Sequence, residues 1–129
     1  MGGKGVIHMT LSDIEKLTKE NTFFRKVIFT GDHSQLVLMS IPVGEEIGEE
    51  VHAGIDQLLF IVEGDAEAIL DGEVIHAPDE GVVIVPGGVR HNIKNIGDEE
   101  LKLYTVYAPP EHPEGTVHKT KEEAALAEY

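Results

Sequence analysis

The chain of 129 residues contains no cysteine and no tryptophan, and aromatic residues make up only 5% of it. The lack of cysteine excludes disulfides, thiolate metal sites and thiol nucleophiles. Basic residues are also few: 10 Lys and Arg against 24 Asp and Glu give a formal net charge of −14. A fold this acidic repels phosphates and anionic lipid, so we expect no nucleic-acid partner and no membrane partner. Seven histidines remain, which makes imidazole and carboxylate groups the candidates for chemistry.

Long apolar runs are missing too. The first twenty residues contain no apolar segment of the kind a signal peptide has. The longest unbroken aliphatic run, residues 82–85, is far too short to span a bilayer. We therefore expect a single cytoplasmic domain over residues 1–129, large enough to bury about two-thirds of its unfolded surface.

Short apolar or β-branched runs separated by turn residues predict an all-β domain. The turn at Asp71-Gly72 is the clearest, because a type I′ hairpin turn needs positive φ at both central residues. With no helices between them, runs at this spacing are typical of an antiparallel sandwich or barrel. The eight expected strands cover residues 23–29, 35–41, 58–62, 66–70, 74–76, 82–85, 91–94 and 101–107.

Helices are expected only near the two ends of the chain. An amphipathic helix is predicted over residues 10–20, with Ser12 and Glu15 forming a capping box at its start. A charged helix is predicted over residues 119–128. Before it, the proline-rich segment 108–113 is expected to lie as an extended arm on the surface.

Two segments carry the side chains best suited to metal chemistry. In the first, Glu50 and His52 project from the same face of an extended chain, and Gln57 opens the next apolar strand. In the second, an aliphatic strand runs into a Pro-Gly-Gly turn at 86–88, and the returning strand presents His91. Each of these side chains alone is more often a solvated or packing residue, so the argument for a site depends on their joint spacing.

This spacing resembles the two sequence motifs of the cupin family. The first motif is a glycine, five residues, a His-x-His pair, three or four residues, a glutamate, six residues and a glycine. Its positions are held here by Gly44, Glu50, His52, Gln57 and Gly64. The second motif ends in Pro-x-Gly, two residues, a histidine, three residues and an asparagine. Its positions are held by Pro86, Gly88, His91 and Asn95, with the preceding glycine displaced by one residue to Gly81.

The resemblance implies a jelly-roll β-barrel over about residues 23–108, a C-terminal arm over 109–129, and one divalent metal ion inside the barrel mouth. The implied ligands are Glu50, His52, Gln57 and His91. Glu50 replaces a histidine of the usual set and Gln57 replaces the glutamate. One carboxylate and three neutral ligands suit Fe, Mn, Co, Ni or Zn without selecting among them.

A metal with open coordination positions can act as a Lewis acid or activate dioxygen, so the expected function is a metalloenzyme acting on a small oxygen-rich substrate. The resemblance is to small stand-alone cupins labelled mannose-6-phosphate isomerase-like, and it also implies a homodimer. Oxygenase chemistry ranks ahead of sugar-phosphate isomerase chemistry, because few cations lie near the strands to hold a phosphate. The alternatives are a non-catalytic module that binds a small ligand and a purely structural role.

The residues around the metal are harder to choose, because a slip of one residue reverses the face of every side chain on a strand. Phe60 and Tyr107 are the candidate substrate-binding residues, with core packing as the alternative, and Arg25 could also line the pocket. His112 is expected to be an arm residue. His118 is expected to be exposed, or else to fold over the mouth of the barrel.

Overall fold

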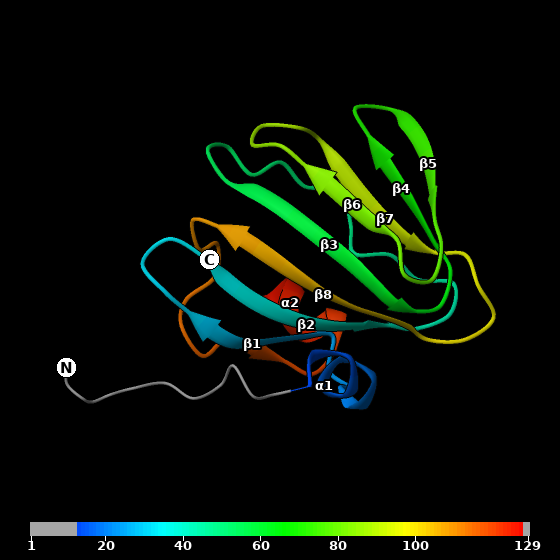
Figure 1. Cartoon of the computed structure of the whole chain (residues 1–129), viewed down its shortest axis with the longest axis horizontal. Coiled ribbons are helices and arrows are strands. Elements are labelled where there is room, and N and C mark those ends of the chain that lie inside the picture. The colour runs from blue at the N-terminus through cyan, green and yellow to red at the C-terminus, as the bar shows by residue number, and fades with distance from the viewer. Residues whose placement is uncertain (1–12, 128–129) are drawn as a thin grey trace.

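The computed structural model describes residues 13–127 of the chain (Figure 1). Two short helices lie near the ends of this range, α1 (Ile14–Glu20) and α2 (Lys121–Leu126). The strands are β1 (Arg25–Thr30), β2 (Gln35–Ile41), β3 (Asp56–Glu63), β4 (Ala66–Leu70), β5 (Glu73–Ala77), β6 (Val82–Val85), β7 (His91–Asn95), β8 (Leu101–Ala108) and β9 (Val117–His118). No helix within the described range has both the length and the apolar character needed to cross a membrane.

The strands form two sheets that face each other across one core (Figure 1). Six strands lie in the order β6-β3-β8-β2-β1-β9, and three lie in the order β5-β4-β7, with antiparallel pairing throughout. Between residues 13 and 127 the two sheets stay separate and do not close into one hydrogen-bonded ring. The all-β jelly-roll prediction is confirmed, with the expected barrel taking the form of a two-sheet sandwich.

Local sequence accounts for most of the strands. Each predicted run corresponds to one of β1 to β8, within about two residues at either end. At the β4–β5 turn, Asp71 has φ 49° and Gly72 has φ 85°, as the type I′ prediction required. The sequence did not predict β9, which adds two residues of the C-terminal arm to the edge of β1.

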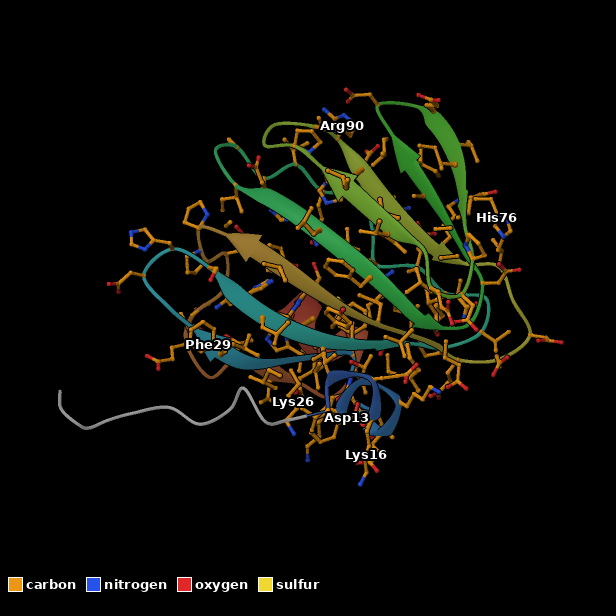
Figure 2. All side chains as sticks on the ribbon, viewed as in Figure 1. Asp13, Lys16, Lys26, Phe29, His76 and Arg90 are labelled. Atoms are coloured by element: carbon orange, nitrogen blue, oxygen red, sulfur yellow. The ribbon has the colours of Figure 1, made fainter. Side chains whose placement is uncertain are left out.

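The first helix begins later than predicted. Its N-cap is Asp13, whose carboxylate accepts a hydrogen bond of 3.1 Å from the Lys16 N–H (Figure 2). The predicted cap at Ser12 is therefore wrong, and residues 10–12 lie outside the described range. α1 packs on the outer face of β3 and β8. α2 begins after Thr120 and is shorter than the predicted helix over 119–128.

Several motif residues shape turns. Gly64 has φ +107°, and a Cβ there would lie 3.1 Å from the backbone of Leu101, so a larger residue would be strained and crowded. Asn95 donates hydrogen bonds of 2.9 Å from its amide to the carbonyls of Ile41 and Glu99. These residues fasten the loops between strands.

One end of the sandwich interior is polar. Along most of β2, β3 and β8 the inward side chains are fully buried aliphatic residues such as Met39, Leu59 and Leu103. Near the end, Gln35 and Gln57 both lie opposite Tyr107 in the sheet register. Since partners in an antiparallel register point to the same face, these three side chains form a row on the inner face. This polar end holds the candidate site.

Candidate metal centre

Glu50 and His91 are brought together by backbone pairing. The Glu50 N–H donates to the His91 carbonyl at 2.8 Å, and the His91 N–H donates to the Glu50 carbonyl at 2.9 Å. Residues 45–50 thus run as an irregular extra strand beside β7, with a further hydrogen bond from the Ile47 N–H to the Ile93 carbonyl. The acidic segment 45–50 therefore positions Glu50, one of the candidate ligands.

His52 is held by the turn that precedes β7. Its carbonyl accepts a hydrogen bond of 3.0 Å from the Gly88 N–H. Gly88 has φ +87°, a conformation that a residue with a side chain rarely adopts, so the glycine lets this turn approach His52. The His52 side chain is almost completely buried.

Glu50, His52 and His91 each offer a ligand atom, and these atoms all lie within 4.8 Å of one another. The Nε2 atoms of His52 and His91 lie 3.3 Å and 4.0 Å from Oε1 of Glu50. The two imidazole centroids are 5.2 Å apart. Two imidazoles and one carboxylate facing a common point make a donor set that suits divalent iron, manganese, cobalt, nickel or zinc.

Both imidazoles turn Nε2 toward Glu50 and have an oxygen atom beside Nδ1. Nδ1 of His91 lies 2.9 Å from the Val89 carbonyl, so this nitrogen carries the proton and Nε2 keeps its lone pair. Nδ1 of His52 faces Oε2 of Glu111 at 3.4 Å. Histidines that bind metals commonly have such an oxygen on the second nitrogen, which fixes the tautomer and the orientation of the ring.

Gln57 lies on the inner face of β3 and is 2% exposed. Its amide nitrogen donates to Oγ1 of Thr105 at 3.1 Å, and its carbonyl oxygen is buried without a hydrogen-bond partner among the described residues. The Nε2 atoms of His52 and His91 are likewise buried without a well-aligned partner. Because buried polar atoms are normally satisfied, three orphaned acceptors beside one carboxylate fit a cation at this point.

The Glu50 carboxylate and the His52 imidazole favour each other's charged forms. Burial alone would raise the pKa of Glu50, but the contact with His52 and the charges of His52 and Arg25 outweigh it and lower that pKa. The contact with Glu50 raises the pKa of His52 against the opposing effect of burial. Without a metal, the carboxylate thus stays ionised and draws protons toward His52.

The sequence of the described domain matches the family described as Cupin domain over residues 37–107, which is more than half of the chain. The protein is a cupin.

Relatives of this cupin include proteins with no stated activity. YrkC of Bacillus subtilis (strain 168), an uncharacterized protein, is 43% identical over 122 residues, covering 90% of this chain and 66% of the relative. An uncharacterized protein of Acanthamoeba polyphaga mimivirus is 38% identical over 109 residues, covering 81% of this chain and 68% of that protein. The chain thus spans about two-thirds of the length of these two relatives.

A solved structure has nearly the same fold throughout. The crystal structure of BH2720 from Bacillus halodurans has a TM-score of 0.90 and 41% sequence identity, covering 98% of this cupin and 97% of that chain. The KdgF structure from Halomonas sp., at 20% identity and a TM-score of 0.63, shares the fold over 67% of this chain. The fold of this cupin, with its two facing sheets, is therefore shared with these solved structures.

The structure separates the two predicted substrate-binding residues. Tyr107 lies at the centre, with its ring centroid 5.7 Å from that of His52, and burial raises its pKa far above the usual value. Phe60 points the other way, because it is three residues from Gln57 on the same strand. It stacks on Tyr104 at 4.7 Å, beside Ile14 of α1. Placing Phe60 at the substrate pocket is therefore wrong.

The C-terminal arm reaches the centre, which sequence reasoning missed. Glu111 contacts His52, and the His112 ring packs edge-on against Tyr107 at 5.2 Å between centroids. Gln35 fastens this part of the arm: its Oε1 accepts from the N–H groups of Glu111 (3.1 Å) and His112 (3.0 Å), and its Nε2 donates to the His112 carbonyl (2.7 Å). The one signal in the sequence was a glutamine opening an otherwise apolar strand.

Two further residues are buried together on the neighbouring strands β1 and β9. Arg25 on β1 is 7% exposed and His118 on β9 is 5% exposed, and Nη1 of Arg25 lies 3.2 Å from Nδ1 of His118. The expectation that His118 is exposed is wrong, because β9 places it beside β1 on the inner side of the sheet.

Proposed function

We propose that this cupin binds one divalent metal ion through Glu50, His52, Gln57 and His91 and is a metalloenzyme acting on a small oxygen-rich substrate. The observation that carries the proposal is a set of buried atoms that have no well-aligned hydrogen-bond partner within residues 13–127. They are Nε2 of His52, Nε2 of His91 and Oε1 of Gln57, gathered around the Glu50 carboxylate. A bound metal would supply a Lewis acid, or a centre that activates dioxygen.

The chain's own residues have definable parts in this function. Glu50 supplies the one negative charge among the four ligands. Glu111 and the Val89 carbonyl orient the two imidazoles. Tyr107 and the arm cover the inner side of the centre, so a bound substrate would be shielded from water.

The choice between enzyme and binding module depends on turnover. One relative carries the name of an enzyme: the polyketide synthase CurC of Streptomyces cyaneus is 33% identical over 66 residues, covering 51% of this chain and 43% of that protein. This supports the enzyme as the first candidate. The non-catalytic small-ligand module stays the second, and the isomerase-like subtype stays a prediction from the resemblance.

Metal content tests the proposal directly. Protein purified without chelator or nickel affinity resin should contain about one Fe, Mn, Co, Ni or Zn per chain, and the variants His52→Ala and His91→Ala should lose it. His76→Ala is the matched control, because His76 is an exposed histidine paired with Asp65 at 2.6 Å (Figure 2). A parent protein that is empty and cannot be loaded contradicts the proposal.

With the metal identified, oxygen uptake and sugar isomerisation can be screened on the loaded protein. Oxygen uptake that the His91→Ala variant lacks supports oxygenase chemistry. A loaded protein that binds small oxygenated compounds and turns none of them over supports the binding module instead.

A further inference from the structure

The two histidines of the candidate centre are oriented in different ways. Nδ1 of His91 lies 2.9 Å from the carbonyl of Val89, in the turn that leads directly into the same strand. Nδ1 of His52 lies 3.4 Å from Oε2 of Glu111, which belongs to the C-terminal arm and is far along the chain. The orientation of His91 is therefore set within its own segment, and the orientation of His52 depends on where the arm lies.

The arm is fastened to the six-stranded sheet around Glu111 by its backbone. The N–H groups of Glu111 and His112 donate to Oε1 of Gln35 at 3.1 Å and 3.0 Å, and Gln35 is completely buried on β2. A little further along the arm, the Thr116 carbonyl accepts a hydrogen bond of 2.9 Å from the Val27 N–H on β1. Contacts that do not involve the Glu111 carboxylate thus hold this side chain beside His52.

Two carboxylates lie on opposite sides of the His52 ring. Oε1 of Glu50 is 3.3 Å from Nε2, and Oε2 of Glu111 is 3.4 Å from Nδ1. A neutral imidazole carries one proton, so it donates to only one of these carboxylates at a time. A metal ion on Nε2 would leave this proton on Nδ1, where Glu111 is the acceptor. Metal binding and the contact of the arm with His52 should therefore favour each other.

We infer that Glu111 is a positioning residue of the metal centre, and that through it the affinity for metal is coupled to docking of the C-terminal arm. The inference rests on the proposed function, because the coupling exists only if His52 binds a metal ion. Coupling of this kind is reciprocal. The docked arm raises the affinity for metal by the same factor by which the bound metal favours the docked arm.

Removal of the Glu111 carboxylate tests the effect of the arm on the metal. Glu111→Ala keeps the backbone N–H that donates to Gln35, so the arm keeps this anchor. Its Zn(II) affinity at about pH 8, measured by competition with a chromogenic chelator, should be about tenfold to a hundredfold weaker than that of the parent. Glu111→Gln keeps an oxygen at this place and should recover part of the loss. Glu114→Ala is the matched control, because it removes the same charge from an exposed position of the same arm and should bind Zn(II) as the parent does.

Hydrogen exchange tests the effect of the metal on the arm, and its main measurement needs no variant. The His112 amide exchanges with solvent when its hydrogen bond to Gln35 opens. Saturation with Zn(II) should slow this exchange at least about fivefold in the parent, observed by NMR, and leave it within about twofold in Glu111→Ala. A purely structural role of Glu111 would not remove the response to Zn(II), because the hydrogen bond whose opening is measured is present in both proteins.

The outcomes separate this inference from the proposed function. Equal Zn(II) affinity in Glu111→Ala and Glu114→Ala overturns the inference and leaves the metal site standing. Exchange at His112 that does not respond to Zn(II) in the loaded parent does the same. A parent that takes up no metal overturns the proposed function, and the inference with it.

Discussion

At the scale of single residues, Gln57 is one of the two positions at which this cupin departs from the ligand set of the motif it resembles. An amide fills a position that is a glutamate in the family pattern, and it is 2% exposed with its carbonyl oxygen unpartnered. A neutral ligand there lowers the repulsion with Glu50 in the empty protein. It also gives up the second carboxylate that would hold a metal more tightly.

The variant Gln57→Glu should therefore lower the stability of the metal-free protein and raise its affinity for the metal. A carboxyl group buried at this position should lower the unfolding free energy of the metal-free protein by roughly 1–3 kcal/mol. The same group should bind Zn(II) at least tenfold more tightly, measured by competition with a chromogenic chelator. Gln57→Ala is the comparison, and it should weaken metal binding. Equal metal affinity in all three proteins would show that position 57 lies outside the coordination sphere.

His112 gives a prediction for pH dependence. Burial, then the charge of Arg25, lower its folded pKa from 6.5 to about 4. Between pH 6.5 and 4 the unfolded chain binds a proton on the His112 imidazole and the folded protein does not. The free energy of unfolding therefore falls as the pH falls through this range. The loss attributable to His112 amounts to about 2 kcal/mol by pH 5.

The variant His112→Phe keeps a ring against Tyr107 and removes this titration. Urea unfolding of the metal-free proteins at pH 7 and pH 5 should show a smaller acid loss for the variant than for the parent, by that amount. The other histidines are common to both proteins, so their titration largely cancels in the comparison. The same acid loss in both proteins would mean that His112 titrates normally in the folded state.

The sequence predicted that Glu50, His52 and His91 lie close together, because the fixed spacing of the two motifs places them there. Glu50 and His91 stand at equivalent points of two motif segments that pair with each other. It failed for Phe60 because the face of a strand depends on parity, which hydrophobicity alone left open. The sequence did not predict that Arg25 and His118 are buried against each other, because no local pattern marks an inward-facing cation.

At the scale of elements, the strands were predictable and the arm was not. Alternating burial and turn residues are local, and they determine β1 to β8 within about two residues. The course of residues 109–113 depends on one distant side chain, Gln35, and on β9 pairing with β1. Long-range contacts of this kind leave no periodicity in the arm itself.

Replacing Gln35 should release the arm while the sheets stay folded. Gln35→Ala removes the acceptor of two arm N–H groups, so we expect hydrogen exchange at the Glu111 and His112 amides to speed up at least tenfold. Thr30→Val is the control, because it removes only the hydrogen bond from Gln35 to Thr30 and leaves those to the arm. Unchanged exchange at both amides in Gln35→Ala would mean that other contacts fasten the arm.

At the scale of the whole molecule, the resemblance implies a homodimer, and the outer face of the six-stranded sheet offers a surface for it. Val82 and Ile84 on the outer side of β6 are 50% and 59% exposed. Next to β6 lies β3, and its Phe60 stacks on Tyr104 of the neighbouring strand β8 on the same outer face. Two copies with a net charge of −14 each repel one another, so exposed apolar side chains such as these favour pairing at this face.

Light scattering after gel filtration tests this arrangement. The parent should elute with the mass of two chains, and Ile84→Glu should elute as a single chain because a buried carboxylate at the interface is unpaired. Val74→Glu is the control, since Val74 on β5 is also 59% exposed but belongs to the other sheet. A parent with the mass of one chain contradicts the dimer.

The backbone bonds between Glu50 and His91 have a consequence for the stability of the fold. These residues are 41 positions apart (91 − 50), and the loop between them contains β3 to β6. A metal ion held by both would cross-link the chain across this loop. In the chain-entropy description, a link closing a loop of that size stabilises the folded state by about 3–5 kcal/mol. The protein has no cysteine and so no disulfide. Removing the metal with a chelator would lower the stability of the fold by removing this cross-link, as reduction of a disulfide does in a secreted domain.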